Sequence, residues 1–74
     1  MDDKLDFLVY CIESYKNAKR LKGKEALEVF NKYRVFDYIN SCYEALHTTG
    51  REYIIEDLNI YIDARQKVEL GSLH

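Results

Sequence analysis

The chain of 74 residues is long enough for one small domain, and its 47% hydrophobic and 32% charged residues are typical of a globular protein. A formal net charge of −2 argues against nucleic acid as the main target, because proteins that bind it usually carry an excess of positive charge. Charges interrupt every apolar run, and Met1-Asp2-Asp3 is acidic where a secretory signal is basic, so we expect a cytoplasmic protein without a membrane segment.

The first predicted helix covers residues 3–20. Its apolar residues recur at spacings of three and four, which is the period of one helix face. Aspartates lie in its first turns and basic side chains in its last, so the charges at both ends interact favourably with the helix dipole and stabilise the helix. We expect the apolar face to pack in the core; its residues are Leu5, Leu8, Val9, Ile12 and Tyr15, widened by Phe7, Cys11, Ala18 and Leu21.

A second, short helix is predicted over residues 24–33, after Gly23 interrupts the first pattern. A helix of about ten residues is marginal alone. We therefore expect it to be held by docking Leu27 and Phe30 on the neighbouring helices. Arg34 then marks the corner that leads to the next helix.

The third predicted helix covers residues 35–47 and carries one apolar line. Thr48, Thr49 and Gly50 are expected to end it, because glycine tolerates the left-handed conformation that closes many helices and threonine hydroxyls cap backbone groups. The apolar line consists of Val35, Ile39, Cys42 and Leu46.

The fourth predicted helix covers residues 53–66, after a short extended segment that begins at Arg51. The alternative of a strand is confined to residues 52–55, which are too few to build a sheet. Residues 67–74 are predicted to form a flexible tail. The apolar residues of this helix are Ile55, Leu58 and Ile62, flanked by Ile54 and Tyr61.

These elements predict an all-α fold, in which four short-to-medium helices form one compact bundle over residues 1–66. Cys11 and Cys42 lie within apolar patterns, and their separation matches neither a zinc site nor a redox motif. We therefore interpret both as buried thiols and expect no metal site. A disulfide between them is the less favoured alternative in a cytosolic chain.

Four features together resemble a family of short, uncharacterised bacterial all-helical proteins. They are the amphipathic opening helix at residues 6–15, Gly23-Lys24-Glu25, Asp37-Tyr38, and Leu46-His47-Thr48 before Tyr53-Ile54-Ile55-Glu56-Asp57. The resemblance covers residues 5–62 and implies a stand-alone domain of unknown function, often encoded near ADP-ribosyltransferase-like toxins, with an antitoxin-like or accessory role. The chain departs from the family pattern at Arg34, where glycine is common, so this corner needs another geometry or some strain.

His47 is the residue best suited to acid–base chemistry, because imidazole titrates near neutrality. No serine or cysteine nucleophile accompanies it in a known motif, and the other histidine, His74, lies in the tail. We interpret His47 as a helix-end residue that hydrogen-bonds a backbone carbonyl or water, with a ligand-facing role as the alternative. The sequence thus predicts no enzyme, no catalytic residue and no cofactor.

A basic run crosses the corner between the first two predicted helices. It raises the alternative of a small nucleic-acid-binding domain, against which stand the net charge and the few base-reading side chains of the third helix. The simpler interpretation is a solvated helix end. The run consists of Lys16, Lys19, Arg20, Lys22 and Lys24.

Seven tyrosines are more than so small a domain can bury, so some rings must be partly exposed. Tyrosine is enriched at contact surfaces, although rings can also line the edge of a core with their hydroxyls in water. We predict a non-enzymatic protein-protein interaction module with a protein partner, in the antitoxin-like case a bacterial toxin, and we also expect self-association into a homodimer. The predicted partner-binding residues are Tyr33, Tyr43, His47, Tyr53 and Tyr61.

Overall fold

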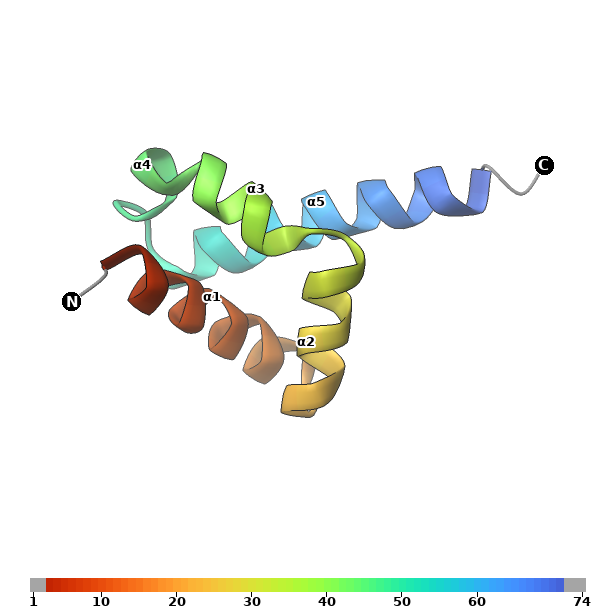
Figure 1. Cartoon of the computed structure of the whole chain (residues 1–74), viewed down its shortest axis with the longest axis horizontal. Coiled ribbons are helices and arrows are strands. Elements are labelled where there is room, and N and C mark those ends of the chain that lie inside the picture. Colours follow the sequence, from red (N-terminus) through yellow and green to blue (C-terminus); the bar gives the residue numbers. More distant parts are fainter. Residues whose placement is uncertain (1–2, 72–74) are drawn as a thin grey trace.

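The computed structural model describes the backbone of residues 3–71 and the side-chain surroundings of residues 3–68. All regular structure in this range is helical, which confirms the predicted all-α fold. The two long helices are α1 and α5, and the last turns of α5 extend beyond the other helices (Figure 1). The helices are α1 (Asp3–Lys19), α2 (Gly23–Lys32), α3 (Val35–Ser41), α4 (Tyr43–Leu46) and α5 (Arg51–Gly71).

The predicted third helix is divided at Cys42 into α3 and α4. The amide of Cys42 is shared between the carbonyl oxygens of Tyr38 and Ile39, each 3.1 Å away. A shared amide of this kind marks a tightened helix end. Because the tightening leaves the apolar spacing unchanged, the sequence pattern indicates one helix where the structure has two.

The chain leaves α4 through hydrogen bonds of two threonine hydroxyls, as predicted. Thr48 Oγ1 donates to the carbonyl of Ala45 at 3.2 Å, and Thr49 Oγ1 donates to that of Leu46 at 2.7 Å. Gly50, in contrast to the prediction, is not left-handed. The hydroxyls already satisfy the last carbonyls of α4, so no left-handed residue is needed to bring backbone amides to them.

The last helix is longer than predicted at both ends. The amide of Ile54 donates to the carbonyl of Gly50 at 3.1 Å, so residues 51–54 form a helical turn and the expected extended segment is wrong. Burial of Ile54 in the core outweighs the strand preference of its β-branched side chain. At the other end α5 continues through Gly71 instead of ending at residue 66. The flexibility of residues 67–74 stays a prediction, and residues 72–74 lie outside the described range.

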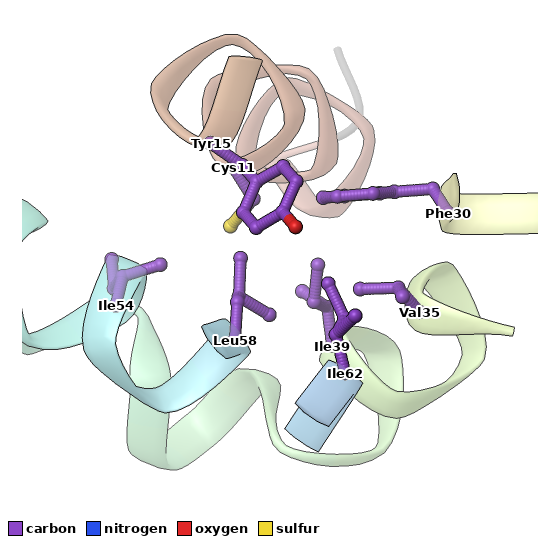
Figure 2. Packing of buried hydrophobic residues seen from close by; sticks show 8 residues of the cluster. All are labelled: Cys11, Tyr15, Phe30, Val35, Ile39, Ile54, Leu58 and Ile62. Atoms are coloured by element: carbon purple, nitrogen blue, oxygen red, sulfur yellow. The ribbon is translucent and has the colours of Figure 1, made fainter. Parts of the chain in front are cut away.

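One cluster of buried side chains joins α1, α2, α3 and α5 (Figure 2). Three of its members, at four-residue spacing, line the inner face of α5, as the period of a helix requires. The thiol of Cys11 is free and buried, as predicted, whereas that of Cys42 is free but only half-buried because it lies at the turn before α4. The cluster consists of Cys11, Tyr15, Phe30, Val35, Ile39, Ile54, Leu58 and Ile62.

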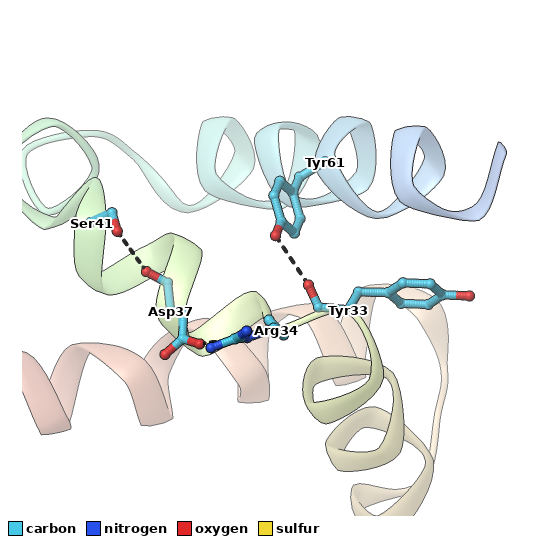
Figure 3. A network of polar contacts seen from close by, with 5 residues as sticks. All are labelled: Tyr33, Arg34, Asp37, Ser41 and Tyr61. Atoms are coloured by element: carbon cyan, nitrogen blue, oxygen red, sulfur yellow. Dashed lines mark hydrogen bonds and ion pairs between the residues drawn. The ribbon is translucent and has the colours of Figure 1, made fainter. Parts of the chain in front are cut away.

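Arg34 turns the chain from α2 into α3 in the left-handed backbone conformation, with φ 56° and ψ 43°. Its amide bonds to the carbonyl of Asn31 at 3.4 Å and its own carbonyl accepts the amide of Tyr38 at 3.2 Å, so one residue ends α2 and begins α3. Its Nε lies 3.0 Å from the carboxylate of Asp37 (Figure 3). The corner thus keeps the left-handed geometry, and a residue with a Cβ is strained there.

Replacing Arg34 with glycine is expected to stabilise the protein by about 1 kcal/mol, because glycine adopts this conformation without steric cost. The lost ion pair with Asp37 subtracts little, since both side chains are largely exposed. Arg34→Ala is the matched control, because it removes the ion pair and keeps the strain, and it should not stabilise. Urea unfolding at one protein concentration measures both; an Arg34→Gly midpoint no higher than that of the wild type would contradict the strain.

Candidate functional site

Three side chains on the apolar faces of the first two predicted helices are exposed. Leu5, Val9 and Leu27 leave 57%, 52% and 45% of their surface accessible, so the prediction that Leu5 and Val9 pack in the core is wrong. Together with three half-buried neighbours they form a concavity of about 320 Å³ that apolar side chains alone line. We call this surface the α1–α2 face; its residues are Leu5, Leu8, Val9, Ile12, Leu27 and Phe36.

The orientation of α1 explains why this surface is uncovered. The helix turns Cys11, Ser14 and Tyr15 toward the core and leaves Leu5 and Val9 outside. Small side chains such as those of cysteine and serine allow a neighbouring helix to come close, and the separation of packed helices depends on the side chains at the contact. The apolar stripe of α1 is wider than the surface that its neighbours cover. The helices of the domain therefore leave part of the apolar surface of α1 exposed to solvent.

Tyr43 and His47 lie together at α4. Their rings stack with centroids 4.5 Å apart, and Nδ1 of His47 lies 2.7 Å from the carbonyl oxygen of Tyr43. The predicted hydrogen bond of a helix-end histidine is confirmed, and Nδ1 must be the protonated donor because a carbonyl oxygen only accepts. The ring of Phe7 meets that of Tyr43 edge-on, with centroids 5.5 Å apart. These contacts tie α4 to α1.

Tyr33 and Tyr61 meet where the end of α2 approaches α5. The hydroxyl of Tyr61 donates to the carbonyl of Tyr33 at 3.0 Å (Figure 3), and its ring stacks on that of Tyr38 with centroids 4.1 Å apart. The hydroxyl of Tyr38 donates in turn to the carboxylate of Asp57 at 2.6 Å. Burial, and then this carboxylate, raise the pKa of Tyr38 above its usual value. The contacts hold α3 and the end of α2 against α5.

The structure brings the predicted partner-binding residues together as two pairs, Tyr43 with His47 and Tyr33 with Tyr61. Tyr53 is largely exposed on α5. The described residues that line the α1–α2 face include none of these five side chains, whose part in binding stays a prediction. Sequence reasoning missed this face, although the width of the apolar stripe on the first helix was a signal for it.

A comparison with known protein families finds a match that extends from α1 into α5. Residues 6–65 match the family described as Protein of unknown function (DUF3791). The chain belongs to this family. The predicted resemblance to a family of uncharacterised proteins is thereby confirmed, and the matched range contains the α1–α2 face except Leu5. No curated protein and no solved structure matches the chain.

The basic run of this DUF3791 domain lies at the corner between α1 and α2. Arg20 ends α1 in the left-handed conformation, with φ 56°. Nζ of Lys16 lies 3.1 Å from the carboxylate of Glu13, and the backbone amide of Lys22 donates to the carboxylate of Glu25 at 2.8 Å. Carboxylates therefore lie among the cations of this corner. The exposed members of the run are Lys19, Arg20, Lys22 and Lys24.

A larger, polar concavity of about 680 Å³ lies over α3 and α5 of the DUF3791 domain. Arg34 pairs there with Asp37, and the guanidinium of Arg65 lies 4.9 Å from the centre of the Tyr61 ring. Nζ of Lys4 lies 5.5 Å from the centre of the Tyr43 ring. The lining thus combines both signs of charge, and each of its three cations already has a contact within the domain. The lining residues are Lys4, Arg34, Asp37, Tyr38, Asn40, Ser41, Tyr61 and Arg65.

The reactive groups of the domain are few. Burial raises the pKa of the Cys11 thiol to about 12, so this side chain remains a protonated thiol at neutral pH. Within the part of the chain that the structure describes, no three side chains of His, Cys, Asp or Glu are grouped so that they could hold a metal ion.

None of the helices between residues 3 and 71 has the length and apolar character needed to cross a membrane.

Proposed function

We propose that this protein is a non-enzymatic protein-interaction module and that the α1–α2 face is its contact surface. One observation supports this most strongly: exposed and half-buried apolar side chains join there in a concave, wholly apolar surface. Apolar surface in water is unfavourable by roughly 25 cal/mol per Å². A contiguous surface of this kind is typical of sites where another protein docks.

We further propose that the partner is a bacterial toxin in the cytoplasm and that the protein acts as its antitoxin-like or regulatory companion. The resemblance to a family encoded near ADP-ribosyltransferase-like toxins supports this role. Co-expression with the product of the neighbouring gene, followed by co-purification and a growth assay, tests it. A protein that never captures that product, and never relieves its toxicity, would rule out the antitoxin-like role.

Val9→Glu is expected to weaken capture of the partner at least tenfold, because it buries an unpaired carboxylate in the contact. Val68→Glu is the matched control, since Val68 is an exposed valine on α5 that lies outside the α1–α2 face. Both variants should unfold near the wild-type temperature, because substitutions at exposed positions change stability little. A quantitative pull-down compares them, and equal capture by both would place the contact on another surface.

A further inference from the structure

We propose that the polar concavity over α3 and α5 is part of a binding site for a phosphate-bearing small molecule. A second concavity of about 430 Å³ adjoins it, because Arg34, Tyr61 and Arg65 line both. We call the two together the α3–α5 site. It is separate from the proposed contact surface, since none of its described lining residues belongs to the α1–α2 face. The second concavity is lined by Lys32, Tyr33, Arg34, Tyr61, Arg65 and Val68.

The charge of the α3–α5 site is opposite to that of the whole chain. Its described lining residues include four cations and one carboxylate, that of Asp37, whereas the chain has a formal net charge of −2. A concave surface with a surplus of one sign of charge concentrates ions of the other sign. The site therefore attracts anions to a protein whose net charge repels them. The four cations are Lys4, Lys32, Arg34 and Arg65.

Arg65 is held by an aromatic ring, and no described carboxylate pairs with it. Its guanidinium lies 4.9 Å from the centre of the Tyr61 ring, which is itself fixed by stacking on Tyr38. The hydroxyl of Tyr61 is fixed in addition by its hydrogen bond to the carbonyl of Tyr33 (Figure 3). A ring attracts a guanidinium through its face and uses none of the N–H donors. Arg65 thus keeps both its charge and its donors for a ligand.

Arg34 lines both concavities from the corner between α2 and α3. Its contact with Asp37 engages Nε at 3.0 Å, so the terminal nitrogens of the guanidinium are left for a further acceptor. The residue also keeps a left-handed backbone that glycine would adopt without strain. Backbone strain of this kind is found at ligand-binding residues, where the side chain is needed in spite of its cost.

The surplus of positive charge favours a phosphate over a carboxylate as the ligand group. A carboxylate carries a single negative charge, whereas a phosphate monoester carries roughly −1.5 to −2 near pH 7. The guanidinium groups of Arg34 and Arg65 also suit phosphate, because an arginine donates two parallel hydrogen bonds to its oxygens. Small-molecule sites usually have volumes of roughly 300 to 1,000 Å³, so the site is large enough for an organic phosphate or a diphosphate.

Isothermal titration calorimetry of the full chain with inorganic pyrophosphate tests the site. At low ionic strength we expect a dissociation constant of about 0.1 mM for the wild type and roughly tenfold weaker binding for Arg65→Gln, which removes a charged donor. Arg51→Gln is the matched control and should bind as the wild type does, because Arg51 is exposed on the same helix and lines neither concavity. A wild type that does not bind millimolar pyrophosphate, or equal binding by the two variants, would overturn the proposal.

Arg34→Gly separates binding from folding. The variant should be more stable than the wild type and yet bind pyrophosphate on the order of tenfold more weakly, because it relieves the strained backbone and removes a cation of the site. Loss of binding then has a cause other than unfolding. Urea unfolding and calorimetry of the same preparation measure both effects, and a variant that binds as tightly as the wild type would contradict the site.

An acidic segment of a protein is the competing ligand for these cations. A polyglutamate peptide of the same net charge as pyrophosphate, titrated under the same conditions, should bind more weakly, and tighter binding of the peptide would overturn the assignment to a phosphate. Val9→Glu should bind pyrophosphate as the wild type does, because Val9 lies on the α1–α2 face. Failure of the proposed contact surface and failure of the α3–α5 site are therefore distinguishable.

Discussion

Leu58→Ala is expected to lower the free energy of unfolding by about 3 kcal/mol, within the range of roughly 2 to 5 kcal/mol for truncating a buried leucine. The side chain is fully buried on the inner face of α5, between α1 and α3 (Figure 2). A single core in a domain of this size usually supplies only about 3 to 5 kcal/mol. The substitution should therefore leave a large fraction of the protein unfolded at 25 °C.

Ile60→Ala is the matched control, because Ile60 lies two residues further along α5 and 62% of its surface is accessible. Its truncation should change the unfolding free energy by less than about 0.5 kcal/mol. Urea unfolding followed by far-ultraviolet circular dichroism measures both variants. If the two alanines had equal effects, the inner and outer faces of α5 would be assigned wrongly.

The apolar lines of the third and fourth predicted helices were sufficient to find most of the core. Val35, Ile39 and Leu58 are buried where their spacing places them, because helical periodicity alone brings them to one side of a helix. Periodicity also holds across the tightened turn at Cys42, so it identified the buried face although it missed the division into α3 and α4.

The first helix shows what periodicity cannot decide. Leu5 and Val9 belong to the same apolar stripe as Tyr15, yet only Tyr15 is buried. The pattern shows which side of the helix is apolar, but the neighbouring helices determine which part of a wide stripe they cover. The candidate contact surface is made of the remainder, which explains why it was first counted as core.

Local residue preferences were overruled at the corners. A left-handed residue was expected at Gly50, whereas the described residues with positive φ are Arg20 and Arg34. Both arginines end a helix at a corner where the next helix begins within three residues, and the chain takes the left-handed turn there although each residue carries a Cβ. The sequence pattern located both corners but not their geometry.

Alkaline pH is expected to destabilise the fold through groups that burial keeps protonated. Burial raises the pKa of the Cys11 thiol to about 12 from an ordinary value of 9.0, and raises the pKa of Tyr15, with a smaller contribution from Asp63. The pKa of Tyr38 is raised by burial and by its hydrogen bond to Asp57. The folded protein thus holds these protons at a pH where the unfolded chain releases them.

The direction of the effect follows from linkage. Because the pKa values are higher in the folded state, their contribution to stability is fully present below about pH 9 and is lost as pH rises toward the folded-state values. For Cys11, the free energy of unfolding falls by about 1.4 kcal/mol per pH unit in that window. For the fully buried Cys11 alone, the loss reaches on the order of 2 kcal/mol at pH 10.5.

Urea unfolding at pH 7.5 and at pH 10.5 measures this loss, and Cys11→Ala separates the contribution of the thiol from that of other titrating groups. The variant is less stable at pH 7.5 because it leaves a small cavity, but its stability should fall less between the two pH values. Cys42→Ala retains the buried Cys11 thiol and should keep most of the pH dependence, because Cys42 makes only the smallest contributions to the raised pKa of Tyr38. Equal pH dependence of the two variants would show that the Cys11 thiol ionises as readily in the folded protein as in the unfolded chain, and that its burial is not what makes the fold sensitive to alkali.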